Sequence, residues 1–384
     1  MIYLDNSATT RPLDAAVLAA REMLEENWFN PSALYGQAVR VEKKMDACRA
    51  SIASALSAKP DQVVFTGCGT EADSLAILGA AERLRGKRRV LLFAGEHPAV
   101  LNTAAQLAAL SQEVELVPAT DEGVIDLDAL SALLNERVGL VGCMHVNNET
   151  GAVQPIARVS RLLQEKSPGA LLHVDGVQGF LRVPLDLRAA GVHLYAVSAH
   201  KVHGPKGVGA LIVSKGVKLS PRLAGGGQEG GLRSGTENTA GIAAFGEAVR
   251  WASAQEGAPE RLRRMKLLLF ERLRESIDGL RVNGPAPESG EAAPHILNVS
   301  FPGVGGEVMV HALEAEGVLC GTGAACSSKK REMSAAFRAM RAPRWAAESA
   351  VRFSFGFLNT IEEAEEAAEA AVRCYRRYQG FQRR

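Results

Sequence analysis

The segment Leu194-Tyr-Ala-Val-Ser-Ala-His-Lys-Val-His-Gly-Pro-Lys-Gly207 contains a short apolar run, then a lysine, then a turn of glycine and proline. The run Leu194–Val197 predicts a buried strand, so Lys201 follows the carboxyl end of that strand. A lysine amine in a cleft loses solvent, which lowers its pKa and lets it hold an aldehyde cofactor as a Schiff base. For a lysine taken alone a solvated surface position is the commoner interpretation, and neighbouring signals are needed to favour the cleft.

The chain around this segment alternates short β-branched runs with helical stretches rich in Ala and Leu. Such alternation predicts an α/β fold with a mainly parallel sheet that helices cover on both faces. The expected strands are residues 62–66, 89–93, 114–117, 139–143, 171–174, 194–197 and 209–213. The expected helices between them include one that opens near Thr70, one at 99–110 and one at 127–134.

The pattern of residues along the sequence changes after about residue 255, which indicates a second, smaller domain. A charged amphipathic helix is expected over residues 260–277, followed by a Pro/Gly-rich boundary loop at 283–290. An Ala/Glu-rich helix is expected from 361 to about 378. The 384 residues are ample for one large core and a second domain.

The composition excludes several classes of function. Lys and Arg total 44 against 43 Asp and Glu, so no basic field favours nucleic acid. The six cysteines form no C-x-x-C pair, which leaves a metal site without support, and their sparse spacing fits a reducing compartment. There is no signal segment at the start and no apolar run of the roughly 18–20 residues that span a bilayer. We therefore expect a cytoplasmic globular protein that binds neither membrane nor nucleic acid directly.

Polar residues follow other expected strands, at the edge where open α/β sheets bind ligands. The turn Gly67-Cys-Gly-Thr-Glu71 joins a strand to a helix, and its glycines let backbone N–H groups at the helix N-terminus approach a phosphate. Asp175 ends another strand, where its carboxylate can hold a protonated ring nitrogen of a cofactor. The plain alternatives are a tight strand–helix turn for the first and a helix-capping aspartate for the second.

Four more residues are candidates for binding. His97 and Asn148 follow strands and can stack on a cofactor ring and bind a substrate carboxylate, although each residue alone is more often structural. Thr236 ends the glycine-dense loop 225–236, which is either a linker or a sign of a nearby anion. Arg352 lies between apolar strand residues and needs a carboxylate partner, which is either the substrate or an internal Asp or Glu.

Cys326 lies in the run Cys320-Gly-Thr-Gly-Ala-Ala-Cys-Ser-Ser328, a thiol among small residues. The glycines before it suit a swinging loop, and Lys329–Arg331 after it can lower the thiol pKa or dock an acidic protein, or simply form a solvated charge run. A cysteine on such a loop can attack what a cofactor activates. With Lys201, it points to chemistry on a sulfur-containing amino acid.

Together these motifs resemble, in order and over nearly the full length, the pyridoxal-phosphate-dependent cysteine desulfurases of fold type I, in the branch with a long cysteine loop. Each motif is modest, but their joint order and spacing are specific. The motifs are residues 3–10, 30–32, 70–71, 96–97, 146–149, 173–175 with 178, 198–201, 204–207, 233–236, 298–301, 326–328 and 352–354.

The resemblance implies a seven-stranded, mostly parallel sheet in a large cofactor-binding domain at residues 15–255. It implies a smaller α+β domain made of residues 1–14 and 256–384, which carries the cysteine loop at about 320–335.

The resemblance also implies a role for each candidate residue. Lys201, Cys326 and His97 would be catalytic: the lysine carries the cofactor, the cysteine accepts sulfur and the histidine stacks on the ring. Asn148 and Arg352 would bind the substrate carboxylate. The implied cofactor-binding residues are Gly69, Thr70, Asp175, Gln178, Ser198, His200, Lys201 and Thr236, the last of which reaches across from the partner subunit of a homodimer.

The implied reaction converts L-cysteine to L-alanine through aldimine and ketimine intermediates. It leaves a persulfide on Cys326 for a sulfur-acceptor protein, such as an iron–sulfur scaffold or a tRNA-thiolation enzyme. Cys68, Ser74, Tyr35 and the sequence Gly-Ala-Ala-Cys depart from the commoner family residues, but none removes a named catalytic group. A selenocysteine lyase, an aminotransferase-like lyase and a non-catalytic sulfur-assembly scaffold are the alternatives; the presence of Cys326 and Lys201 favours the desulfurase.

Overall fold

The computed structural model describes residues 1–84, 86, 88–322 and 333–380. Its centre is a seven-stranded sheet, which confirms the predicted α/β fold class and the seven predicted strands. In spatial order the strands are β2 (Val63–Thr66), β8 (Gly209–Val213), β7 (Leu194–Ser198), β6 (Leu171–Asp175), β5 (Val138–Gly142), β3 (Arg89–Phe93) and β4 (Glu113–Val117).

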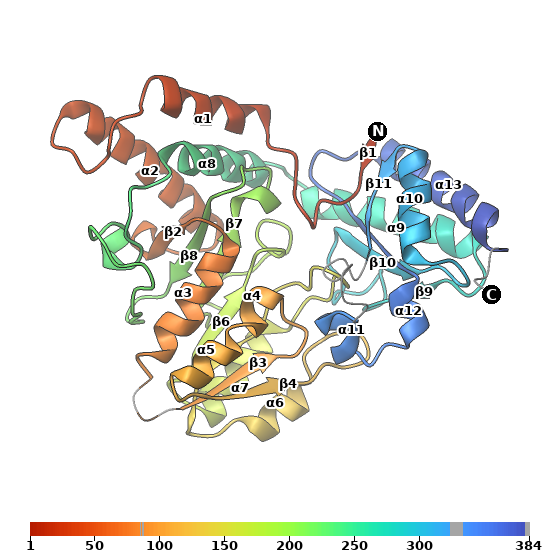
Figure 1. Ribbon diagram of the computed structural model, residues 1–384, viewed down its shortest axis with the longest axis horizontal. Helices are drawn as coiled ribbons and strands as arrows, with labels where there is room; N and C mark the ends of the chain where they lie inside the picture. Colours follow the sequence, from red (N-terminus) through yellow and green to blue (C-terminus); the bar gives the residue numbers. More distant parts are fainter. Residues whose placement is uncertain (85, 87, 323–332, 381–384) are drawn as a thin grey trace.

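Helices cover both faces of this sheet (Figure 1). Side chains of β7 alternate between the faces: Leu194 and Ala196 join the core beneath α3, whereas Tyr195 and Val197 join the core on the opposite face. The helices of the large domain are α1 (Asp14–Glu25), α2 (Gly36–Ala55), α3 (Gly69–Ala81), α4 (Pro98–Leu101), α5 (Ala104–Ala109), α6 (Leu127–Leu133), α7 (Ile156–Lys166) and α8 (Thr239–Ser253), with the 3₁₀ turns η1 (Pro60–Gln62), η2 (Ala199–Lys201) and η3 (Glu229–Gly231).

The strand β8 runs antiparallel to both of its neighbours, β7 and β2, while the other pairs in the sheet are parallel. β7 and β8 therefore form a hairpin, and its connection contains η2 with Lys201. Because β2, β3, β5, β6 and β7 all point the same way, their carboxyl ends meet at one edge of the sheet. The lysine turn lies at that edge.

The remainder of the chain builds a second core around a four-stranded sheet (Figure 1, right). Ile2 and Leu4 from the start of the chain belong to this core, because β1 pairs with β11 in parallel. The domain boundaries expected from the sequence stay a prediction. The elements are β1 (Ile2–Tyr3), α9 (Ala258–Ser276), β9 (Arg281–Val282), β10 (Ile296–Ser300), α10 (Gly306–Ala315), β11 (Val318–Leu319), β12 (Gly321–Thr322), α11 (Ala335–Ala339), α12 (Arg344–Glu348), β13 (Ala350–Ser354) and α13 (Ile361–Tyr378).

One predicted helix is wrong in its extent. The stretch 99–110 forms two short helices, α4 and α5, instead of one. The break falls at Thr103, whose hydroxyl and backbone N–H both bond to the carbonyl of Val100, at 2.6 and 3.0 Å. A threonine that bonds to its own backbone in this way competes with the helical pattern. In the part of the chain that the structure describes, every helix is too short or too polar to cross a bilayer.

Candidate active site

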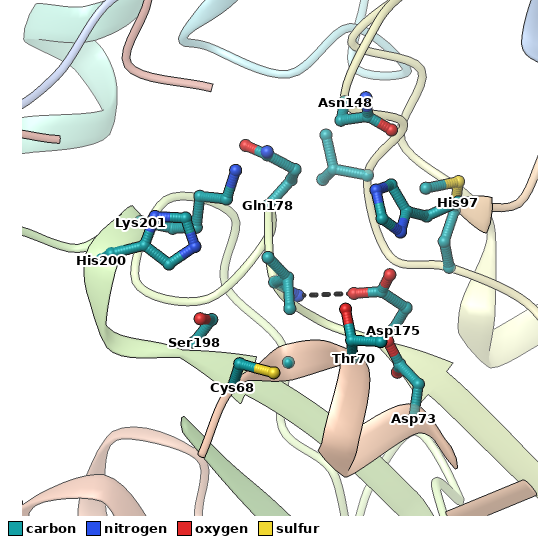
Figure 2. A pocket seen from close by; sticks show the side chains of 14 residues that line it. Cys68, Thr70, Asp73, His97, Asn148, Asp175, Gln178, Ser198, His200 and Lys201 are labelled. Atoms are coloured by element: carbon teal, nitrogen blue, oxygen red, sulfur yellow. Dashed lines mark hydrogen bonds between the residues drawn. The ribbon is translucent and has the colours of Figure 1, made fainter. Parts of the chain in front are cut away.

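A cavity of about 260 Å³ opens at the carboxyl edge of the large sheet, between the N-terminus of α3 and the turns after β3, β5, β6 and β7 (Figure 2). Most of the predicted site residues line it. They are Gly69, Thr70, His97, Asn148, Asp175, Gln178, Ser198, His200 and Lys201. Residues that come from five separate turns of the chain therefore share one pocket, as expected where parallel strands end together.

Lys201 extends from the β7–β8 hairpin into this cavity. Its Nζ donates to the carbonyl oxygens of Ser7 and Ala8, at 2.5 and 2.8 Å. Burial lowers the pKa of its amine from 10.5 to about 8, and the positive charges of Arg352 and Arg182 add to this effect. The amine is therefore available in its neutral, nucleophilic form close to neutral pH.

Asp175 is the last residue of β6 and its carboxylate is buried at the floor of the cavity. Its Oδ1 accepts a bond of 2.9 Å from the backbone N–H of Val177 (Figure 2). Burial, with a smaller contribution from the nearby carboxyl of Asp73, raises its pKa to about 6. A buried carboxylate of this kind gains free energy from a cationic partner, such as a protonated ring nitrogen.

His97 caps the N-terminus of α4, on the side of the cavity opposite Lys201 (Figure 2). Its Nδ1 accepts a bond of 3.1 Å from the backbone N–H of Ala99, so the proton of the neutral ring is on Nε2. Burial lowers the pKa of the imidazole; Asp175 opposes this effect and Lys201 adds to it. The ring is thus held neutral and in one orientation beside the cavity.

The N-terminus of α3 and the end of β7 form a cradle for an anion. Cys68, the N-cap residue, makes no side-chain bond to the first helical N–H groups, which stay available to a ligand. The hydroxyl of Ser198 is buried and has no hydrogen-bond partner among the described residues. A Cβ at Gly69 would lie 2.7 Å from Val177 Cγ2, so only glycine leaves this space open. A phosphate fits such a cradle.

Gln178 lines the same cavity as Lys201 (Figure 2). Its Nε2 donates to the carbonyl of Ser7 at 2.9 Å, the same oxygen that accepts from Lys201. Its Oε1 is buried and has no partner within the described ranges of the chain. That end of the amide is free to bind a hydroxyl group of a molecule in the cavity.

Comparison with known proteins decides the family. The model of the aminotransferase class-V family matches residues 2–366. The chain belongs to this family. A cysteine desulfurase of Trichormus azollae is 36% identical, with 92% of this chain and 88% of that protein covered. The cysteine desulfurase NifS of Azotobacter vinelandii is 35% identical, with 94% and 89% covered. A solved NifS-like protein superposes with a TM-score of 0.89 at 32% identity, over 97% of this chain and 98% of that one.

Arg352 of this class-V family member lies on β13 in the small domain and does not line the cavity. It donates from Nη1 to the carbonyl of Asn148 at 3.0 Å and from Nη2 to Oδ1 of Asp5 at 2.6 Å. Of the two partners that the sequence left open, the structure therefore shows an internal carboxylate. Asn148, whose backbone it holds, does line the cavity.

Thr236, like Arg352, does not line this cavity. Thr236 is exposed and lines a separate cavity of about 80 Å³, together with Gly67 and Arg233. Cys326 lies outside the described residues, as do Lys329–Arg331 that follow it.

Sequence reasoning gave no role to several residues of this class-V site. Asp73, near the start of α3, lines the cavity, and its Oδ1 lies within hydrogen-bond distance of Nε2 of the buried His173, at 3.1 Å. Ser7 and Ala8 lie in the motif at residues 3–10, but the sequence assigned no role to them. The signal for Asp73 was available, because it lies three residues after Thr70 and so shares a helix face with it. Ser7 and Ala8 accept through their backbone carbonyl oxygens, which every residue has, so the side chains give no signal for this role.

Proposed function

We propose that this protein is a pyridoxal-phosphate-dependent cysteine desulfurase. The observation that carries the proposal is the convergence of the Lys201 amine, the Asp175 carboxylate and the anion cradle of α3 on one cavity. An aldehyde cofactor with a ring nitrogen and a phosphate requires these three groups. The family and the names of the relatives support the same reaction.

The residues of the cavity fit the cofactor. Lys201 would attach its aldehyde carbon, Asp175 would pair with its ring nitrogen and Gln178 with its ring hydroxyl. His97 would stack on the ring. Gly69, Thr70, Ser198 and His200 would hold the phosphate; the unpartnered hydroxyl of Ser198 supports this assignment. When bound, the cofactor supplies an electron sink for the carbon that loses its proton.

L-cysteine is the proposed substrate. Asn148 and Arg352 would bind its carboxylate. The bond from Arg352 to the Asn148 backbone supports this, because it holds the two residues next to each other. The amine of Lys201, about half of which is neutral at pH 8 because of its burial, would take the α-proton once the substrate amine has displaced it.

Cys326 would accept the sulfur. Its thiolate attacks the substrate sulfur, so an S–S bond forms as the C–S bond breaks. The electron pair of the broken bond goes to the carbon skeleton, which takes up protons and leaves as L-alanine. The persulfide on Cys326 then passes its outer sulfur to an acceptor protein. An iron–sulfur scaffold and a tRNA-thiolation enzyme are the acceptors that we propose, and a cytoplasmic location stays a prediction.

We also propose that the protein is a homodimer in which Thr236 completes the cofactor site of the partner. Thr236 is exposed and away from the cavity of its own chain. Large apolar side chains are exposed on α1, on the connection that follows it and on the start of α2, which is unusual for a monomer. They are Val17, Leu18, Leu24, Trp28, Leu34, Tyr35 and Val39.

The first test of the proposed function is the Cys326→Ala variant. We expect it to lose release of sulfide from L-cysteine with dithiothreitol by at least about 100-fold, because the sulfur acceptor is gone. The visible absorbance of the cofactor should be unchanged, since the cavity is intact. Sulfide production and absorbance spectra measure the two effects.

Cys374→Ala is the matched control, because Cys374 is a free cysteine on α13, remote from the cavity. It should desulfurate at the wild-type rate. Near-normal turnover by Cys326→Ala would remove this thiol from the mechanism.

A further inference from the structure

Asp5 and Arg352 form the most buried arginine–carboxylate ion pair to which the described part of the small domain contributes. Arg352 Nη2 lies 2.6 Å from Asp5 Oδ1, and the exposed fractions of the two side chains are 6% and 24%. The guanidinium is also held on Nη1 by the Asn148 carbonyl, while its Nε is buried and has no partner among the described residues. Two sides of the guanidinium are therefore fixed and further N–H donors are unused.

The backbone is shaped around this pair. Gly321 on β12 lies opposite Arg352 in the register of the small sheet. A Cβ on Gly321 would lie 2.8 Å from Asp5 Oδ1 and 2.9 Å from Arg352 Nη2. Any other residue at this position would push Asp5 and Arg352 apart, so the glycine on β12 leaves the space that the ion pair needs.

Asp5 is also the first residue of a segment that ends at the cavity, here called the N-terminal strap (Asp5–Ala8). Its Ser7 donates from the backbone N–H to Ser354 Oγ at 2.8 Å, which fixes the strap to β13. The carbonyls of Ser7 and Ala8 accept from Lys201. The strap thus joins the arginine and the lysine through three residues of backbone.

We propose that Asp5 is a positioning residue for Arg352, and that it makes the site specific for substrates with an α-carboxylate. This inference rests on the proposed function, in which Arg352 binds the substrate carboxylate. Asp5 does not touch the substrate; it holds one edge of the guanidinium so that the unused N–H groups keep a fixed direction. A guanidinium fixed in this way loses less rotamer freedom when it binds a second carboxylate.

The charge of Asp5 gives a competing expectation of opposite sign. A carboxylate already paired with Arg352 repels the carboxylate of the substrate and competes with it for N–H donors. If competition dominated, removal of Asp5 would tighten binding of the substrate. If positioning dominates, removal weakens it. The sign of the change therefore decides between the two.

The experiment compares two ligands of the cofactor-loaded enzyme, L-alanine and ethylamine, which differ in the carboxylate. Each is titrated by the change in visible absorbance of the cofactor, so no desulfuration is needed. We expect Asp5→Ala to raise the apparent Kd of L-alanine about tenfold, as for loss of a charge-assisted bond, and to leave ethylamine within about twofold. Asp5→Asn, which keeps an acceptor oxygen, should lie between the wild type and Asp5→Ala.

Asp14→Ala is the matched control, because Asp14 is an exposed aspartate near the same end of the chain that pairs weakly with Arg11 at 3.5 Å. It should bind both ligands as the wild type does. Gly321→Ala should reproduce the loss of L-alanine affinity without any change of charge.

Three results would overturn the proposal. Tighter binding of L-alanine by both Asp5 variants would show charge competition. An equal loss for L-alanine and ethylamine would show a purely structural role. Additive effects of Asp5→Ala and Arg352→Lys in the double variant would show that Asp5 does not act through Arg352.

Failure of the proposed function gives a different pattern. If the wild type does not release sulfide from L-cysteine but still discriminates L-alanine from ethylamine, the desulfurase assignment fails. The role of Asp5 in carboxylate recognition is then still decided by its variants.

Discussion

The amine of Lys201 shows how burial and backbone acceptors act together on one residue. A neutral amine has two N–H groups, and the carbonyls of Ser7 and Ala8 are placed to accept both. The lone pair is then left for attack on an aldehyde. Burial is the main cause of the low pKa, and Arg352 and Arg182 add to it, while Asp175 and Asp5 oppose it. The lysine is therefore prepared for covalent attachment before a cofactor arrives.

We predict that Lys201 in the cofactor-free protein reacts with an amine-selective acylating reagent with a midpoint near pH 8. At that pH about half of its amine is neutral, whereas an ordinary lysine with a pKa of 10.5 has about 0.3% in this form. Mass spectrometry of the peptide that contains Lys201 measures the extent of labelling across pH. A lysine in a short model peptide is the reference.

The lowered pKa of Lys201 also decides in which direction the free energy of unfolding changes with pH. Between about pH 8 and 10.5 the unfolded chain binds the Lys201 proton and the folded chain does not, so the free energy of unfolding should rise with pH in this window. Lys201→Met should remove the Lys201 part of that rise in urea unfolding of the cofactor-free protein and leave the part from Lys266, whose pKa burial lowers from 10.5 to about 7. A labelling midpoint near pH 10.5 would show that the amine is not desolvated.

At the scale of elements, the site is built where the N-terminus of α3 meets the end of β7. The helix start offers backbone N–H groups, and β7 places the Ser198 hydroxyl beside them. The hydroxyl is buried and has no partner in the described part of the chain. An unpartnered buried hydroxyl destabilises a fold, so its presence is explained by a ligand that it binds.

We therefore predict opposite effects of Ser198→Ala on stability and on cofactor binding. The Kd of pyridoxal phosphate should rise about tenfold, because a bond to the phosphate is lost. The melting temperature of the cofactor-free protein should be unchanged or higher, because the variant buries no unpaired hydroxyl. Fluorescence titration and calorimetry measure the two quantities.

Ser214→Ala is the matched control at the far end of the same hairpin. Its hydroxyl donates to the carbonyl of Val192 at 2.8 Å, so the variant should lose about 1 kcal/mol of stability and keep its cofactor affinity. If Ser198→Ala also lost stability and kept its affinity, the hydroxyl would belong to the fold and not to the site.

At the scale of the whole molecule, two cores are joined by the start of the chain. Ile2 and Leu4 pack in the core of the small domain, and the strap that follows reaches the lysine of the large domain. In the large domain, α1 packs against α8 and leaves apolar side chains exposed. These surfaces suggest how two chains would combine.

We predict that Val17→Glu with Leu24→Glu shifts the protein from dimer to monomer. The two residues are seven positions apart on α1 and so share a face, and both are more than half exposed. Charges there would have to be buried in an interface, which is costly. Sedimentation analysis measures the mass, and the cofactor affinity should fall because Thr236 no longer reaches the partner site.

Leu116→Glu is the control for this change. Leu116 is half exposed on β4, the edge strand at the opposite end of the large sheet from β2. It should leave the mass unchanged. A double variant on α1 that sediments like the wild type would place the interface elsewhere.

Local sequence was sufficient for the strands of the large sheet and for Lys201 and Asp175 at their ends. Runs of buried residues and the turns after them depend on neighbours in the chain, and strand ends of a parallel sheet must meet at one edge. Local sequence was not sufficient at Thr103, where a single hydroxyl bond divides a stretch of good helix formers into α4 and α5.

Only the tertiary structure decided which of the two open partners Arg352 has. Asp5 lies 347 positions away in the chain, and Ser7, which accepts from Lys201, lies 194 positions away. Periodicity and turn signals predict only local structure, so they cannot predict these contacts. The contacts arise from how the two cores pack around the strap. The chemistry of single residues and the elements that carry them was therefore determined by the sequence alone, and the pairing of charges across the domains by the packed fold.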